Sequence, residues 1–176
     1  ETGKHIRRVA ECSRLLALYH ESLTDEDADI LFHAAPMHDI GKITIPHSIL
    51  HKPGKLTEDE FAIMKTHTTR AYKILDNSKR KYTKAAAIIA HQHHEKWDGS
   101  GYPQGLKGQD IHIYGRIVGL IDVFDALLHK RVYKDAWPLD ATIDYIRTHS
   151  SSQFDPYLVN LLMEHIDEFV AIADQN

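Results

Sequence analysis

The chain has 176 residues, of which 43% are hydrophobic and 26% charged, an ordinary composition for a globular protein. We expect one domain over residues 1–176, since this length can bury a sizeable core. The formal charge of −4 predicts no surface for duplex nucleic acid, and no apolar run approaches the roughly 20 residues of a membrane helix. The single cysteine, Cys12, excludes an internal disulfide and is compatible with the reducing cytoplasm, where we expect the domain.

The first half of the chain predicts three helices and one loop. The opening segment has apolar residues at helical spacing, and a second helix is predicted from about Asp27 to His38. Glycines and prolines then interrupt the pattern, so residues 41–56 are expected to form an irregular loop. Thr57 followed by Glu60 is a capping-box signature and predicts the start of the third helix.

The second half predicts further helices around one long loop. A fourth helix begins near Tyr82, and the glycines of residues 95–110 then exclude a continued helix. A loop of this length inside a compact domain is usually functional. Residues 117–128 predict a fifth helix, Pro138 begins a sixth, and Asp155 supplies an N-cap for the last. The expected fold class is all-α.

Histidine is unusually frequent, with 14 residues, and neutral imidazole is the commonest protein metal ligand. His67 lies on or beside the apolar face of the third helix. His93 ends the apolar stripe of the fourth, and His94 follows it directly. Asp122 lies inside the apolar fifth helix, where an unpaired buried carboxylate would be costly.

Two pairs of residues add to this set. Glu1 and His5 are four residues apart and share one face of the first helix. His38 and Asp39 lie at a helix end, where both side chains can turn toward one cavity and a carboxylate can bridge two ions. A lone histidine on an apolar face is more often a core residue. Here several helices each present an inward histidine or acid, which favours a site of shared metal ions.

The donors are imidazole and carboxylate without sulfur, which favours Fe, Mn, Ni or Zn over Mg or Ca. Two such ions about 3.5–4 Å apart can hold a bridging hydroxide and neutralise charge at phosphorus. Lys42, three residues after Asp39, is placed to contact a phosphate oxygen, although without the His–Asp pair a solvated loop lysine would be the better interpretation. The sequence therefore predicts a metal-dependent hydrolase of a phosphodiester.

Seven segments carry a resemblance that covers essentially the whole chain. They are ETGKH at 1–5, APMHDIGK at 35–42, KPGKL at 52–56, MKTHT at 64–68, HHEKWDGSGYP at 93–103, RIV at 116–118 and DVFDAL at 122–127. In order and spacing they strongly resemble the HD-GYP family of cyclic di-GMP phosphodiesterases, part of the HD superfamily of metal-dependent phosphohydrolases.

The resemblance implies a bundle of about seven helices with a five-helix core. It implies two or three divalent ions, with Fe or Mn expected first and Ni or Zn as alternatives. Asp39 would bridge two ions, and Glu1 with His5 matches members that hold a third. The implied metal ligands are Glu1, His5, His38, Asp39, His67, His93, His94 and Asp122.

The resemblance also implies which residues contact the substrate. Arg131 and Lys134 match an Arg-x-x-Lys segment that resembles a clamp for guanine and phosphate, and Lys42 joins them as a phosphate contact. Valine at position 132 stands where proline is common, and the Leu-His pair at 128–129 replaces a usually smaller polar pair.

Two more features have open interpretations. The triplet Gly101, Tyr102 and Pro103 is expected to shape the loop and to offer a docking surface for diguanylate cyclase domains. Asp125 is expected either to support the ligands from behind or to make a hydrogen bond on the helix face.

The leading function is hydrolysis of cyclic di-GMP to pGpG, and on to GMP, by a metal-bridging hydroxide with His38, Asp39 and Lys42 as catalytic residues. One alternative is another cyclic dinucleotide such as cyclic GMP-AMP. The other is a receptor that binds without cleaving, which the complete ligand set and Lys42 disfavour. Because the chain begins at the first candidate ligand, we expect a catalytic part of a longer signalling protein.

Overall fold

The computed structural model describes residues 2–131 and 133–175, and within them the fold is all-α, as predicted. No β-strand occurs in these residues. The helices are α1 (Gly3–Tyr19), α2 (Asp25–Ala34), α3 (His47–Leu50), α4 (Glu58–Leu75), α5 (Lys81–Gln92), α6 (Ile113–Leu128), α7 (Leu139–Thr148), α8 (Pro156–Glu164) and α9 (Ile166–Ala173).

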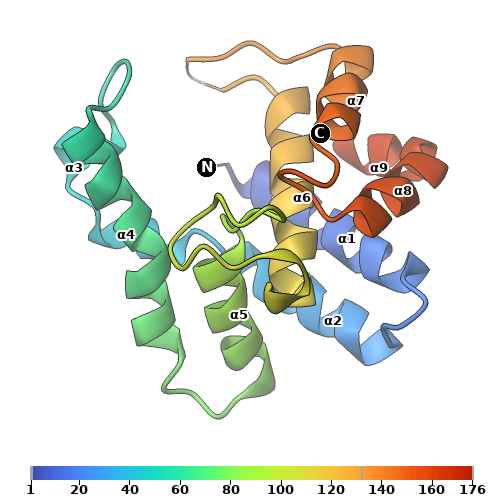
Figure 1. The fold of residues 1–176 in the computed structure, drawn as a ribbon, viewed down its shortest axis with the longest axis horizontal. Coiled ribbons are helices and arrows are strands. Elements are labelled where there is room, and N and C mark those ends of the chain that lie inside the picture. The colour runs from blue at the N-terminus through green and yellow to red at the C-terminus, as the bar shows by residue number, and fades with distance from the viewer. Residues whose placement is uncertain (1, 132, 176) are drawn as a thin grey trace.

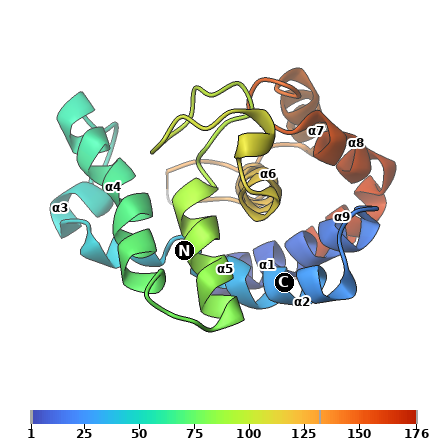
Figure 2. The same ribbon diagram turned by 60° about the horizontal axis from the view of Figure 1, so that its bottom comes forward.

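Helix α6 is the centre of the arrangement. Figures 1 and 2 both show it between α3 and α4 at one end of the molecule and α7, α8 and α9 at the other. It packs against α1 and α5, and Ile117, Ile121 and Phe124 on it are fully buried. Burial of each such side chain contributes about 1.5–3 kcal/mol to folding. A rigid, apolar α6 therefore fixes the position of any polar group that it carries.

The helix starts that the sequence predicted at two caps are confirmed. The Thr57 hydroxyl accepts from the Glu60 amide at 3.2 Å, and the Glu60 carboxylate accepts from the Thr57 amide at 2.9 Å. The Asp155 carboxylate accepts from the amide of Tyr157 at 2.9 Å and begins α8. The chain after Asp155 forms two helices, since α8 ends at Glu164 and α9 begins at Ile166. The ring of His165, between them, stacks on Tyr19 of α1.

The second helix ends earlier than predicted. Helix α2 stops at Ala34, and a 3-10 helix follows at Ala35–Met37. Pro36 explains the change, because proline has no amide hydrogen and its ring clashes with the preceding turn of an α-helix. His38 and Asp39 consequently lie in a turn between this 3-10 helix and a second one at Ile40–Thr44. The turn directs both side chains into the interior. The expected loop at 41–56 contains the single turn α3.

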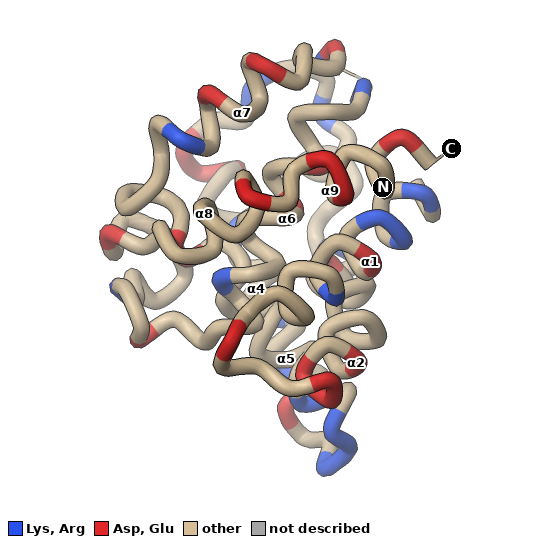
Figure 3. Tube along the Cα trace, turned by 90° about the vertical axis from the view of Figure 1, so that its right-hand side faces the viewer, with Lys and Arg blue, Asp and Glu red and all other residues tan. Residues whose placement is uncertain are grey.

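Surface charge is mixed over the side of the molecule seen in Figure 3. Acidic and basic positions are interspersed along the helices visible in this view, in keeping with the formal charge of −4. Among the described residues, no helix combines the length and the apolar character that crossing a bilayer would require.

Gly41 allows α4 to approach the turn that carries His38 and Asp39. A Cβ atom at Gly41 would lie 1.9 Å from the carbonyl oxygen of His67. We expect Gly41→Ala to lower the free energy of unfolding by about 2–3 kcal/mol, because backbone must move to relieve the overlap. Urea unfolding followed by circular dichroism measures this. Gly3→Ala is the control, since a Cβ there meets nothing within 4 Å. Equal stability of the two variants would contradict the close packing.

Candidate metal centre

Two groups of ligand atoms lie in the interior of the domain. Within each group the atoms are no more than 4.8 Å apart. The first group contains Asp39, His67, His93 and His94, and the second contains His5, His38 and Asp122. The structure thus brings together every metal ligand that the sequence predicted, except Glu1, which lies outside the described residues. The ligands come from α1, α4, α6, the turn after α2 and the end of α5.

Three of the histidines are oriented by their own helical segments. The Nδ1 atoms of His38, His67 and His93 lie 2.8, 2.7 and 3.0 Å from backbone carbonyl oxygens three or four residues earlier. A carbonyl can only accept, so each Nδ1 donates a proton to it and each ring presents Nε2 to the interior. These three Nε2 atoms are buried with no hydrogen-bond partner. Such atoms are costly to bury, and a metal ion would compensate them.

The Asp39 carboxylate lies between the two groups. Its Oδ1 is 3.2 Å from His67 Nε2 and 3.3 Å from His93 Nε2. Its Oδ2 is 3.4 Å from Nε2 of His38 and 2.9 Å from Nζ of Lys42. Each oxygen therefore faces a different group, which is the arrangement that a bridging carboxylate needs.

The second group favours positive charge. Asp122 Oδ1 is 3.3 Å from His5 Nε2 and 3.6 Å from His38 Nε2. Burial lowers the pKa of His38, but Asp122 and Asp39 outweigh burial and raise that pKa well above its ordinary value. Burial raises the pKa of Asp122, but His38 and His5 outweigh it and hold the pKa well below its usual range. A divalent cation fits a pocket with this potential.

His94 is held by ring contacts. Its imidazole stacks on Tyr102, with centroids 4.8 Å apart and an interplanar angle of 19°, and meets the His67 ring edge-on at 5.2 Å. Burial, with a smaller contribution from the neighbouring His93, lowers the pKa of His94 well below its ordinary value. The ring is therefore neutral, as a metal ligand must be.

A buried ion pair stands behind His5. Asp125 Oδ2 accepts from His5 Nδ1 at 2.7 Å, and Arg8 binds both carboxylate oxygens of Asp125, at 2.6 Å from Nε and 3.1 Å from Nη2. Burial raises the pKa of Asp125, but the hydrogen bonds from His5 and Arg8 outweigh it and the net pKa is lowered. Of the two interpretations of Asp125 from the sequence, support of a ligand matches these contacts.

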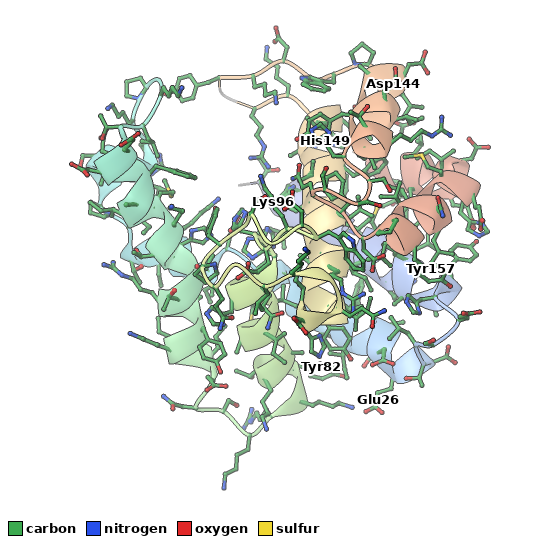
Figure 4. All side chains as sticks on the ribbon, in the orientation of Figure 1. Glu26, Tyr82, Lys96, Asp144, His149 and Tyr157 are labelled. Carbon is green, nitrogen blue, oxygen red and sulfur yellow. The ribbon has the colours of Figure 1, made fainter. Side chains whose placement is uncertain are left out.

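The glycine-rich loop is tied down beside His94. The buried Glu95 carboxylate accepts from the amides of Gln104 at 2.7 Å and Leu106 at 3.0 Å. The Trp97 amide donates to the Gln153 carbonyl at 3.1 Å. Figure 4 labels Lys96 where this loop crosses in front of α5 and α6. The loop therefore forms a fixed wall of the site.

A comparison of sequences identifies the family. Residues 2–158 match the family model described as the HD domain. The chain belongs to the HD domain family. The resemblance to HD-GYP proteins that the sequence predicted is confirmed by homologous cyclic-dinucleotide phosphodiesterases, which match nearly the whole chain.

Curated relatives of this HD domain act on cyclic dinucleotides by name. The chain is 51% identical to the 3'3'-cGAMP-specific phosphodiesterase 2 of Vibrio cholerae, over 98% of this chain and 33% of that protein. It is 45% identical to the cyclic di-GMP phosphodiesterase response regulator RpfG of Xanthomonas campestris, over 99% of this chain and 46% of that protein. The chain thus spans less than half the length of these relatives.

A solved structure shares the fold of this HD domain. It is a cyclic GMP-AMP-specific phosphodiesterase of Vibrio cholerae, with a TM-score of 0.71 and 19% sequence identity. The match covers 98% of this chain and 46% of that one. At this level of identity the comparison shows the fold alone.

The cations that the sequence assigned to substrate occupy two places. Lys42 is half-buried beside Asp39. Arg131 and Lys134 are exposed on the loop after α6, where their backbones exchange hydrogen bonds of 2.8 and 3.1 Å. None of these three cations belongs to the two ligand groups of the HD domain. Position 132 lies outside the described residues.

Sequence reasoning missed two buried charged residues that support the site. Arg8 follows His5 by three residues, a spacing that places both on one face of α1 and that offered a signal. Glu95 directly follows His94, but only the folded loop shows that its carboxylate caps two backbone amides.

Removal of the Asp125 carboxylate tests the support behind His5. In the metal-free protein at pH 7, we expect Asp125→Ala to lower the free energy of unfolding by about 3–5 kcal/mol, because Arg8 would remain buried without a partner. The native pKa of Asp125 is lowered, so this stabilisation is present above the ordinary carboxylate pKa of about 4 and is lost as pH falls below it. Urea unfolding at pH 7 and pH 3 measures both effects.

Glu11→Ala is the matched control, because Glu11 pairs at 3.1 Å with Arg7, whose side chain is 76% exposed. Such a pair contributes about 0–1 kcal/mol. A loss at Asp125 no larger than the loss at Glu11 would show that Arg8 does not depend on Asp125.

Proposed function

We propose that this HD domain is a metal-dependent phosphodiesterase of cyclic dinucleotides, with cyclic di-GMP as the first substrate and cyclic GMP-AMP as the alternative. The observation that carries the proposal is the Asp39 carboxylate, which faces one ligand group with each oxygen. The two named relatives support both substrates, since one is cGAMP-specific and the other is a cyclic di-GMP phosphodiesterase. We further propose pGpG, and then GMP, as products from cyclic di-GMP.

The proposed ions are two divalent transition metals, with Fe or Mn expected first. His67, His93 and His94 would hold one of them, and His5, His38 and Asp122 would hold the other, with Asp39 shared. Glu1 stays a predicted ligand for a third. When bound, two such ions supply an activated water and neutralise charge on the phosphate.

The protein groups around the ions would bind and orient the phosphodiester. Lys42 Nζ is partly exposed and lies 2.9 Å from Asp39 Oδ2, so it can donate to a non-bridging phosphate oxygen without leaving the carboxylate. This cation would stabilise the negative charge that develops at phosphorus. Arg131 and Lys134 are exposed cations on a loop, and we propose that they bind the guanine and phosphate of the dinucleotide.

A partner surface on the glycine-rich loop stays a prediction. Pro103 is exposed and open to a diguanylate cyclase domain, but the Tyr102 ring is half-buried and turned onto His94. Only part of the triplet is therefore offered to a partner. Membership of a longer signalling protein is also a proposal, and the 33% and 46% of the relatives' lengths that the chain covers support it.

Turnover of the two dinucleotides by the Mn²⁺-loaded or Fe²⁺-loaded protein tests the function. We expect conversion of cyclic di-GMP to pGpG, which chromatography of the products at several times detects. Faster turnover of cyclic GMP-AMP would assign the alternative substrate. Full metal occupancy without hydrolysis of either would favour the receptor and contradict the enzyme.

Replacement of Lys42 tests its role apart from the metal. We expect Lys42→Gln to lower kcat about 10²-fold or more, as removal of one preorganised donor to a developing oxyanion does. Metal content should stay unchanged, because a lysine ammonium has no lone pair with which to bind a metal ion. Lys79→Gln, an exposed cation between α4 and α5, is the control. Loss of metal from the Lys42 variant would make Lys42 a structural residue.

A further inference from the structure

His129 makes an unusual pair of contacts at the end of α6. Its Nδ1 lies 2.8 Å from the backbone oxygen of Asp125, and its Nε2 lies 2.9 Å from the backbone oxygen of Ala173 in α9. Both partners are carbonyl oxygens, which only accept hydrogen bonds. Both ring nitrogens therefore face acceptors, and the ring connects the end of α6 to α9. The Asp125 carboxylate oxygen Oδ1 also lies 3.3 Å from Nδ1.

Asp125 connects this histidine to the candidate metal centre. The carboxylate that faces His129 also accepts from His5 Nδ1 at 2.7 Å. His5 Nε2 in turn lies 3.3 Å from Asp122 Oδ1. A continuous series of polar contacts thus runs from Ala173, through His129 and Asp125, to His5. The first group, around His67 and His93, lies outside this series.

We propose that His129 is a positioning residue that couples the C-terminal helix α9 to the His5, His38 and Asp122 group through Asp125. His129 keeps the Asp125 backbone and carboxylate in place, and Asp125 fixes the orientation of the His5 ring. The inference rests on the metal site of the proposed function and is independent of which dinucleotide, if any, is cleaved. Mutation of a group that hydrogen-bonds to a metal ligand commonly weakens metal binding 10–100-fold.

His33 provides a matched control elsewhere in the chain. Its Nδ1 lies 2.9 Å from the backbone oxygen of Asp29 and 3.4 Å from the Asp29 Oδ1, so the local His–Asp arrangement is nearly the same. The Asp29 carboxylate, however, binds the hydroxyl of Tyr82 and no metal ligand. Figure 4 shows Tyr82 and Glu26 at the opposite end of the molecule from the C-terminal end of α6.

The test is a calorimetric titration of chelator-treated protein, with Mn²⁺ as the only added ligand. His129→Phe keeps a ring of similar size but donates no hydrogen bond, and His33→Phe makes the same change at the control site. We expect His129→Phe to weaken Mn²⁺ binding at one site about tenfold and to leave the other site unchanged. His33→Phe should match the wild type at both sites.

A second readout needs no metal. Side-chain ¹⁵N spectra of the metal-free proteins report on the His5 ring directly. The His5 resonances should shift in His129→Phe and stay in place in His33→Phe. If His129→Phe does not fold, His129→Gln replaces it, because glutamine keeps one donor and should shift the His5 resonances less.

The possible outcomes separate the inference from the proposed function. A wild-type protein that binds Mn²⁺ with the same affinities as His129→Phe would overturn the coupling and leave the function intact. Unchanged His5 resonances in His129→Phe would also overturn it. A wild type that binds no Mn²⁺ contradicts the proposed metal site, and the His5 resonances then still decide whether His129 and Asp125 orient His5.

Discussion

The rest of the structure depends on one electrostatic constraint, the burial of several imidazoles and carboxylates around the Asp39 side chain. Three of these histidines bury Nε2 atoms with no hydrogen-bond partner, and such atoms cost about 1–3 kcal/mol each. A metal ion offsets that cost only if all ligands converge, so helices distant in the sequence must meet at one place. The apolar surface of α6 packs against α1 and α5, α4 packs against α5, and Asp122 on α6 faces the ligands.

The candidate ligands differ in what orients them, and this difference indicates which ligands would respond to changes elsewhere in the structure. The rings of His38, His67 and His93 are fixed by carbonyls of their own segments, which form whenever those segments form. His5 depends on Asp125, which is 120 residues away, and His94 depends on Tyr102 in the glycine-rich loop. Changes in the C-terminal helices or in the glycine-rich loop can therefore reach the site through these two histidines.

Much of the fold could be read from local signals, and the errors have local causes. The capping box at Thr57 and the cap at Asp155 were predicted because a few neighbouring residues determine them. The end of the second helix was wrong because apolar periodicity outweighed Pro36, which ends the α-helix at Ala34. The division between α8 and α9 was missed because it coincides with a contact between His165 and Tyr19 of α1.

The sequence by itself determined the all-α class and a set of inward histidines and acids, because helical spacing shows which face each residue shares. It also carried the family resemblance, in motifs such as the His–Asp pair and the loop after His94. Only the tertiary structure decided that the Asp39 oxygens face different groups, that Arg8 and His129 meet at Asp125, and that Glu95 holds the loop. The contacts of Asp39 with His67 and of Arg8 with Asp125 join side chains far apart in the sequence, and no local pattern encodes a distance between elements before they pack.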